Sequence, residues 1–287
     1  MKQLIAIIIL FLIVFCSCSK NDNSKIKLVK SETPILQKTM EQSLKITSES
    51  TSISGNKKTD QDSPLHVSAS ANDFEKVKEL IANGADVNIK DEEEGATPLH
   101  SASSAGHSEV AKILIQNGAD MNSRDFQGST PLHWAIRENR EDIIKLLVLK
   151  GADINARDAE ILTPLHSAAE KCSIKLVRFL ISHNADVNSR EEMGENPLHF
   201  AIDEKRYDIV ELLIEKGSDL KMRDTKYGRT SLYWAVNKGD EKMVKLLLSK
   251  GANPNSRSYD GKSMIQWAKQ KGYDRIVKIL EKNGGKE

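Results

Sequence analysis

The chain has 287 residues, and its 42 Lys and Arg are balanced by 41 Asp and Glu. Because polyanion-binding proteins normally carry a basic excess or a basic patch, this balance argues against a nucleic-acid partner. Three cysteines are too few to build a framework of disulfides.

The first segment, residues 1–17, has the pattern of a signal peptide. Lys2 is followed by an unbroken apolar run from Leu4 to Phe15. A run of about 12 residues is too short to cross a hydrocarbon core of about 30 Å as a helix. It fits the hydrophobic region of a secretory signal peptide. An uncleaved anchor and an ordinary secretory cut are the alternatives.

Two cysteines stand at the end of this segment, in the stretch FCSCSKND. The boundary resembles a bacterial lipobox, where a signal peptidase cuts before a cysteine that then carries lipid. Cys18 follows the small Ser17, whereas Cys16 follows the bulky Phe15. The resemblance therefore implies lipidation of Cys18 and loss of Cys16. Such a protein is lipid-anchored to a membrane of the bacterial cell envelope, on the periplasmic face or the cell surface.

Residues 18–61 are predicted to be a disordered tether behind the anchor cysteine. The stretch is rich in Ser, Thr, Lys, Asn and Glu and shows no sustained hydrophobic period. Such a segment cannot bury enough apolar surface to offset its conformational entropy. About 40 flexible residues give a mean reach of about 35 Å. The alternative, a loop of the fold itself, is disfavoured by this length.

From residue 62 to 285 the sequence repeats with a step of 33 or 34 residues. The first constant phrase is SPLH at 63–66, TPLH at 97–100, 130–133 and 163–166, NPLH at 196–199, TSLY at 230–233 and SMIQ at 263–266. A second follows about twenty residues later. It is GADVN at 84–88, GADMN at 118–122, GADIN at 151–155, NADVN at 184–188, GSDLK at 217–221 and GANPN at 251–255. Composition bias alone does not produce two sequence phrases that recur together at a constant spacing.

Each unit predicts two short helices and a turn, as residues 130–158 illustrate. Thr130 can cap a helix whose first position is Pro131, where a missing N–H costs nothing. Asn139 ends this helix at a position that Gly holds in other units, which indicates a left-handed backbone. A second apolar stretch over 143–147 predicts the next helix, and Gly151 ends it.

The two phrases resemble the ankyrin-repeat family, whose unit of 33 residues carries T-P-L-H-x-A. The resemblance covers about 63–285. It implies a mainly α solenoid of about seven repeats, in which stacked helix pairs carry projecting β-hairpin turns. The repeats start near residues 63, 97, 130, 163, 196, 230 and 263. Because one helix pair cannot bury its own apolar face, neighbouring repeats must stack. We expect a monomer.

The histidines of the motif are predicted to be structural. They are His66, His100, His133, His166 and His199. Packed helices lie about 8–10 Å apart, so such a ladder cannot bring its rings to one metal ion at about 2 Å. In the family, the motif His and Thr form hydrogen bonds within and between units. The Asp of each GAD phrase is likewise expected to bond backbone N–H groups of its turn.

No sequence motif indicates catalysis, a metal or a cofactor. The chain has no P-loop, no G-x-S-x-G and no H-E-x-x-H. We therefore expect a protein that is not an enzyme, the alternative being a site without a recognisable motif.

Cys172 is the single cysteine beyond the N-terminal segment. It stands at the end of a first helix, where other units have Gly, Asn or Lys, so we expect a turn-like and partly exposed thiol. A lone thiol in an exported protein is open to mixed disulfides or oxidation. An inert substitution is the alternative.

The resemblance also implies where a protein partner would bind. In ankyrin proteins, contacts come from the hairpin tips and the exposed ends of the first helices, on the concave face. The candidate residues are Glu93, Phe126, Gln127, Arg137, Ile161, Met193, Asp203, Lys226, Tyr227, Asn237 and Tyr259. Phe126, Met193, Tyr227 and Tyr259 are the predicted anchors, because aromatic residues and Met are enriched in interfaces. Trp134, Trp234, Trp267 and Phe200 share one motif position and are expected to pack, or to stack on a partner.

Ile161 departs from the repeat, because it replaces the Gly of the hairpin. We expect it to alter the turn. With Leu162 it either packs within the hairpin or presents an apolar contact point.

Together these features predict a non-enzymatic, membrane-anchored protein-interaction module of a bacterial envelope. An accessory or protective subunit of an envelope redox enzyme is one alternative. An effector exported to a host cell is another.

Overall fold

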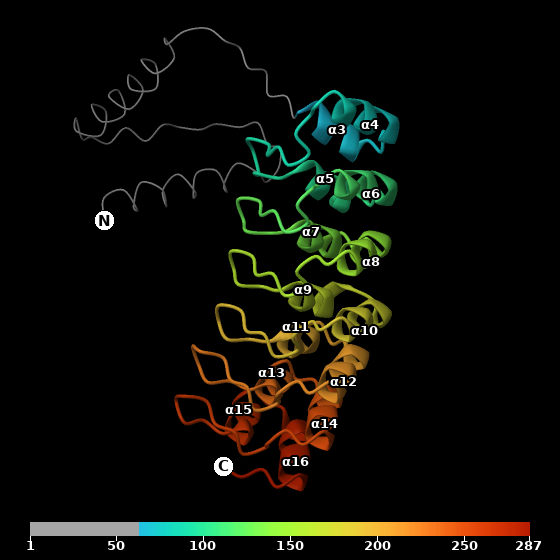
Figure 1. The fold of residues 1–287 in the computed structure, drawn as a ribbon. Helices are drawn as coiled ribbons and strands as arrows, with labels where there is room; N and C mark the ends of the chain where they lie inside the picture. The colour runs from blue at the N-terminus through green and yellow to red at the C-terminus, as the bar shows by residue number, and fades with distance from the viewer. Residues whose placement is uncertain (1–62) are drawn as a thin grey trace, which may run out of the picture. The chain divides into compact units, whose positions relative to one another are not determined.

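The computed structural model describes residues 63–287, which form fourteen helices arranged as seven consecutive pairs (Figure 1). The predicted signal peptide, Cys18 and the tether lie outside the described residues. The helices are α3 (Pro64–Ser70), α4 (Phe74–Ala82), α5 (Pro98–Ala105), α6 (Ser108–Gln116), α7 (Pro131–Arg137), α8 (Glu141–Leu149), α9 (Pro164–Lys171), α10 (Ile174–Ser182), α11 (Pro197–Asp203), α12 (Tyr207–Glu215), α13 (Ser231–Asn237), α14 (Glu241–Ser249), α15 (Met264–Gln270) and α16 (Asp274–Lys282).

The first helix of each pair begins where the T-P-L-H phrase predicts. In α7 the backbone of Thr130 is extended, and Pro131 takes the first helical position. The ring of Pro131 fixes a helical φ and its missing N–H leaves no donor unpaired there. The same start occurs in four other pairs, which confirms the helix boundaries inferred from the motif.

The helix ends also follow the repeat. Asn139, after α7, has the left-handed backbone expected of it, with φ 52°. Gly151, after α8, has φ 92°, and the N–H of Ala152 returns to the carbonyl of Leu147 at 2.9 Å. These left-handed residues turn the chain sharply between the helices.

The turns between pairs are short hairpins. Backbone hydrogen bonds close them, for example from Asp125 N–H to Ser129 O and from Gly128 N–H to Asp125 O, both at 3.0 Å. Within residues 63–287 the β pairing of these hairpins is limited to two isolated bridges, Arg223 with Thr230 and Arg257 with Ser263. Figure 1 shows the hairpins projecting on the side opposite the second helices. We call the residues at their ends the tip row: 92–94, 126–127, 159–161, 192–193, 225–227 and 259–260.

The core runs between successive pairs, as stacking requires. Leu132 of α7, Leu165 of α9 and Leu198 of α11 are fully buried, and so are Ile144 and Leu147 of α8. These residues repeat at the same motif positions, so each pair covers the apolar face of its neighbour. No helix among the described residues has the length and apolar character needed to cross a bilayer.

Candidate interaction surface

The motif histidines form a ladder of hydrogen bonds between repeats. Nδ1 of His100 accepts from the backbone N–H of Thr97 at 3.0 Å, and its Nε2 lies 3.1 Å from the carbonyl of Ser129 in the next unit. Since a carbonyl can only accept, Nε2 carries the proton and Nδ1 the lone pair. The same pairing joins His66 to Ala96 O, His133 to Leu162 O and His166 to Glu195 O, at 2.9, 3.3 and 3.3 Å.

Burial makes these imidazoles poor bases. It lowers the pKa of His100, His166 and His199 to about 4. The pKa of His133 is also lowered, again chiefly by burial. In His100, His133 and His166 the lone pair of Nδ1 and the proton of Nε2 are both used, so these rings join repeats together, whereas Nε2 of His199 has no partner among the described residues. Among residues 63–287, no three His, Cys, Asp or Glu gather into a group that could hold a metal.

A second ladder of asparagines runs beside the hairpins, and the sequence reasoning did not identify it. Nδ2 of Asn188 donates to the carbonyl of Gly217 at 3.0 Å, and its Oδ1 accepts from the N–H of Asp219 at 2.8 Å. Asn155 makes the same two bonds one repeat earlier. The signal was present in the sequence, because Asn ends most of the GAD phrases. The Asp residues bond the turn as predicted, for example Asp153 with the N–H of Asn155.

Both ladders are interrupted at one junction, between residues 196–229 and 230–262. Tyr233 replaces the motif His, and Lys221 replaces the ladder Asn. Within the described residues, three buried polar atoms lack a hydrogen-bond partner at this junction: His199 Nε2, Thr230 Oγ1 and Trp234 Nε1. Since each buried unpaired group costs free energy, this junction is the least stabilised by polar contacts.

The predicted anchors of the tip row are exposed. Phe126 is 70% exposed, Met193 53%, Tyr227 45% and Tyr259 63%. Glu93, Gln127 and Lys226 of the tips are exposed as well, as are Arg137 and Asp203 at the ends of first helices. Asp203 is paired with Lys238 of the next repeat at 2.6 Å, and Asn237 is only half-buried.

Backbone hydrogen bonds hold neighbouring tips together. The N–H of Phe126 donates to the carbonyl of Glu94 at 2.7 Å, and the N–H of Tyr259 donates to that of Tyr227 at 2.8 Å. The ring of Phe126 lies over Gly95, where an added Cβ would come within 2.6 Å of it. Exposed aromatic rings in the tip row are thus held on fixed backbone.

The structure gathers Lys226, Tyr227 and Tyr259 into one cleft and leaves the other candidates spread over successive repeats. The cleft has a volume of about 590 Å³ and lies between the last two tips and their first helices. Sequence reasoning missed three of its residues, Arg229, Tyr233 and Ser258, and offered Trp267 as a packing residue that could stack on a partner. Tyr233 carried a signal, because it replaces the motif His.

The aromatic residue that directly follows the motif position of His is mainly a packing residue. The rings of His100 and Trp134 meet edge-on with centroids 5.3 Å apart, and His166 and Phe200 do so at 5.2 Å. Nε1 of Trp134 donates to Asp125 at 2.7 Å. Phe200, Trp234 and Trp267 are partly buried against the core, and Trp134 is half-buried.

The prediction for Ile161 was wrong. Its φ is 64°, close to the 70° of Gly128 and the 80° of Gly194 at the same place, so the turn is unaltered. A β-branched residue is strained in this conformation, and the repeat imposes it. Ile161 is 36% exposed and therefore contributes a modest apolar surface to its tip.

The expected exposure of Cys172 was also wrong, whereas the interpretation of the residue as an inert substitution agrees with the structure. The residue is fully buried, and its backbone is extended, with φ −84° and ψ 166°, instead of left-handed. The extended backbone lets Ser173 cap α10 and leaves the thiol 3.9 Å from the carbonyl of Ile136. Burial raises the pKa of Cys172 to about 11, which keeps the thiol protonated and poorly nucleophilic.

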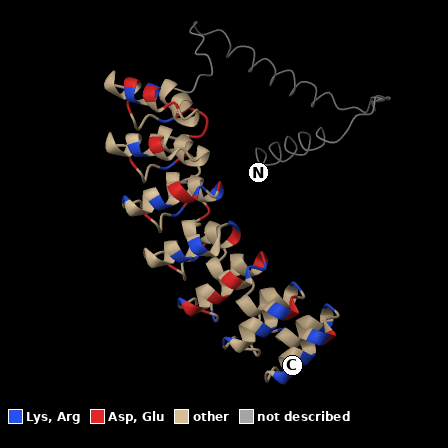
Figure 2. Ribbon diagram, turned by 90° about the vertical axis from the view of Figure 1, so that its right-hand side faces the viewer, with Lys and Arg blue, Asp and Glu red and all other residues tan. Residues whose placement is uncertain are grey.

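Charge is divided along the repeats (Figure 2). Residues 63–219 contain 17 Lys and Arg against 28 Asp and Glu, whereas residues 220–287 contain 16 against 7. Figure 2 shows blue segments along all the repeats, with fewer red segments beside them on the repeats nearest the C-terminus. The change of sign falls within the repeat 196–229, shortly before the junction where both ladders are interrupted.

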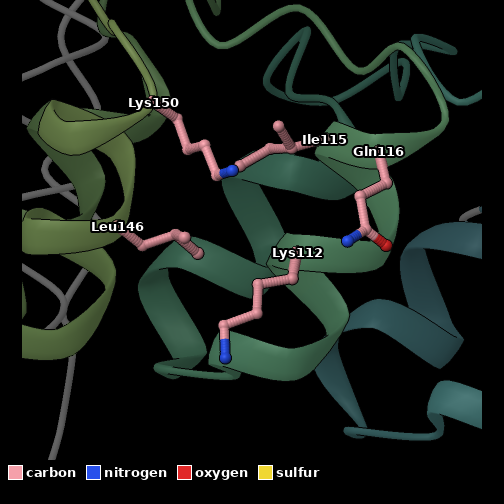
Figure 3. A pocket seen from close by; sticks show the side chains of 5 residues that line it. All are labelled: Lys112, Ile115, Gln116, Leu146 and Lys150. Atoms are coloured by element: carbon pink, nitrogen blue, oxygen red, sulfur yellow. The ribbon is translucent and has the colours of Figure 1, made fainter.

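A smaller hollow of about 160 Å³ lies between α6 and α8 on the side of the second helices (Figure 3). It is lined by Lys112, Ile115, Gln116, Leu146 and Lys150. These side chains offer no nucleophile with an adjacent base, so the hollow has no catalytic arrangement.

Comparison with known proteins identifies the repeat. The sequence matches the family described as Ankyrin repeats (3 copies) over residues 30–125, 65–158, 158–224 and 216–286. A comparison with curated proteins gives no match.

Two solved structures are similar. The human ASB11 ankyrin repeat domain is 27% identical, with a TM-score of 0.67, over 79% of this chain and 100% of that one. The ankyrin repeat domain of Bcl-3, described as a unique member of the IkappaB protein family, is 24% identical, with a TM-score of 0.69, over 78% and 100%. The second likeness shows the fold alone. The chain belongs to the ankyrin-repeat family, whose repeats form protein-interaction modules.

Proposed function

We propose that the chain is a non-enzymatic, lipid-anchored protein of a bacterial cell envelope that binds another protein through its tip row and first-helix ends. One observation carries the binding role. Four large side chains, Phe126, Met193, Tyr227 and Tyr259, stand exposed in the tip row. Exposed aromatic and Met side chains are typical of binding surfaces.

The rigidity of the tips supports this role. Backbone hydrogen bonds join neighbouring tips, so an exposed ring loses little conformational freedom when a partner covers it. The buried histidines and Cys172 leave the described residues without a reactive base or thiol at this surface. The surface is therefore better suited to recognition than to catalysis.

The binding role is tested by crosslinking intact cells and capturing the full chain. Replacing Phe126, Tyr227 and Tyr259 with Ala should reduce capture of the main partner at least tenfold. The matched control is Leu149→Ala, because Leu149 is 67% exposed but lies at the end of α8, away from the tips. Full capture by the triple variant would contradict the assignment of the surface.

The anchor rests on the sequence around Cys18. Labelling with a palmitate tracer should place lipid on the chain, and Cys18→Ser should abolish it while Cys16→Ser does not. Unlabelled protein in the membrane fraction would reject lipidation. Such a result would favour an uncleaved anchor, whereas unlabelled protein outside the membrane fraction would favour an exported effector.

The alternative of an accessory subunit for a redox enzyme gains no support from the described residues. Cys172, their one thiol, is buried and has a raised pKa. Capture of an oxidase or catalase by the crosslinked chain would favour that alternative.

A further inference from the structure

The cleft at the last two tips differs from the rest of the tip row in both charge and shape. It is lined by four aromatic rings, those of Tyr227, Tyr233, Tyr259 and Trp267, together with Lys226 and Arg229. The first tip, by contrast, has the acidic sequence EEE at 92–94. The two ends of the tip row therefore present opposite charge to a partner.

The aromatic walls of the cleft are fixed in place. The rings of Tyr233 and Trp267 meet edge-on at 5.2 Å. The ring of Tyr259 lies over Gly228, where an added Cβ would come within 2.5 Å of it. Tyr259 and Tyr227 are also joined through the backbone at 2.8 Å. A ligand side chain entering here meets a preformed apolar slot, which reduces the entropic cost of binding.

A buried carboxylate positions the basic side of the cleft. Asp224 is 1% exposed and accepts from the N–H groups of Tyr227 at 2.6 Å and Gly228 at 3.0 Å. Its second oxygen accepts from Nε of Arg229 at 2.6 Å. This bond places the guanidinium 4.2 Å from the centroid of Tyr227 and 4.8 Å from that of Trp234.

Lys226 supplies positive charge that the described residues do not neutralise. Its Nζ lies 5.1 Å above the Tyr227 ring, and it forms no ion pair with any residue of 63–287. The acidic residue in the lining, Asp260, accepts a hydrogen bond from Ser258 and pairs with Lys262 at 3.7 Å. The surrounding residues 220–287 carry a clear basic excess.

We propose that this cleft binds an acidic segment of a partner protein, with one apolar side chain in the aromatic slot and a carboxylate on Lys226. Charge complementarity decides the sign of the ligand, because the basic excess of the last repeats attracts carboxylates. The aromatic rings of the cleft provide a second contact, because they can bind one apolar side chain of the peptide. This inference rests on the proposed protein-binding function and names the chemistry of the partner.

The test is selection of a random dodecapeptide library on the immobilised full chain, followed by fluorescence polarisation with a selected peptide. Selected peptides should be enriched in Asp and Glu over Lys and Arg and should share an aromatic or large aliphatic residue. Lys226→Glu and Tyr259→Ala should each raise the dissociation constant of such a peptide at least tenfold.

Two matched controls separate the cleft from general effects. Lys245→Glu makes the same charge change on the exposed face of α14, and Leu149→Ala removes an exposed apolar side chain away from the tips. Both should change the dissociation constant less than twofold. Phe126→Ala removes an equally exposed ring from another tip and tests whether the peptide also reaches that tip. A loss with Lys245→Glu equal to that with Lys226→Glu would overturn the proposal, because it would reduce the effect to net charge.

Other occupants give different results, and each would overturn the proposal. A single-stranded oligonucleotide that displaces the peptide at equal concentration would identify a polyanion site. Self-association abolished by either Lys226→Glu or Glu93→Lys would identify a second copy as the occupant.

The proposed function can survive failure of this inference. If crosslinked capture in cells still needs Phe126 but not Lys226 or Tyr259, protein binding stands and only the cleft is wrong. If the triple tip variant captures the partner fully, the proposed binding surface itself fails.

Discussion

Acid should destabilise this protein through the histidine ladder. Burial lowers the pKa of His100, His166 and His199 to about 4 in the folded chain, from the ordinary 6.5 of a histidine. Because the folded pKa is lower, the unfolded chain binds protons first. The stability these groups contribute is complete above pH 6.5 and is lost as pH falls toward 4.

The magnitude follows from proton linkage. At about pH 5.5 an unfolded imidazole is about 90% protonated, whereas a ladder imidazole is almost entirely neutral. Integrating from about pH 8 gives about 1.4 kcal/mol lost per histidine, or about 4 kcal/mol for the three. Glu195 opposes this, because burial and the neighbouring Glu191 and Asp224 raise its pKa to about 7. Its proton uptake returns up to about 2 kcal/mol over the same window.

The chain itself offers the substitution that isolates this effect. Gln266 occupies the His position of the last repeat, and its Oε1 accepts from the N–H of Ser263 at 2.9 Å. Gln thus keeps the local bond without a titrating ring. The variant carrying His100→Gln and His166→Gln should lose about 2.8 kcal/mol less than its parent between about pH 8 and pH 5.5.

The assay is urea unfolding followed by circular dichroism, for parent and variant at both pH values. Comparing the two differences cancels the cost of the substitutions and the contribution of Glu195. If the free energies of unfolding of parent and variant differ by the same amount at both pH values, the ladder histidines do not titrate as argued.

Three further predictions concern single residues. In a variant where both N-terminal cysteines are Ser, Cys172 should react with a maleimide at least a hundredfold more slowly in the folded chain than in urea. Equal rates would contradict its burial. Lys221→Asn should restore the missing asparagine bonds and raise the free energy of unfolding by about 1 kcal/mol. Asn188→Ala should lower the free energy of unfolding by a similar amount. Both variants are measured by urea unfolding. Ile161→Asn should raise the free energy of unfolding by about 1 kcal/mol, because Asn tolerates the left-handed backbone. Ile161→Val keeps the strained backbone and should not raise the free energy of unfolding.

The regular part of the fold was predictable because each repeat applies the same local rules. Pro131 at the start of a helix and Gly151 after one restrict the backbone by themselves. The structural role of the histidines was equally accessible, because one ring per repeat at helix spacing cannot converge on a shared site. These features depend only on residue type and period.

The departures were not predictable from the motif, because they depend on what neighbouring repeats impose. Ile161 was expected to change its turn, yet the surrounding repeat holds it in the conformation of Gly. Cys172 stands where a left-handed residue is usual, but an extended backbone turns its thiol into the core. In both cases packing between repeats overrides the preference of the single residue.

The candidate surface was predictable in outline only. The period located the tips, and the exposed Tyr227 and Tyr259 followed from it. The cleft they share also needs Arg229, whose position depends on the buried Asp224, and Trp267 from the next repeat. A cleft assembled from the side chains of two successive repeats leaves no pattern within either one.

The central claim is that a protein partner is bound at the tips, and site-specific photo-crosslinking in intact cells tests it most directly. A photoreactive residue is placed singly at 126, 193 and 259 in the tip row, and at 149 and 245 on the second helices. The account predicts an adduct with one common partner from the tip positions and none from 149 or 245. Adducts from 149 and 245, with none from the tips, would contradict it.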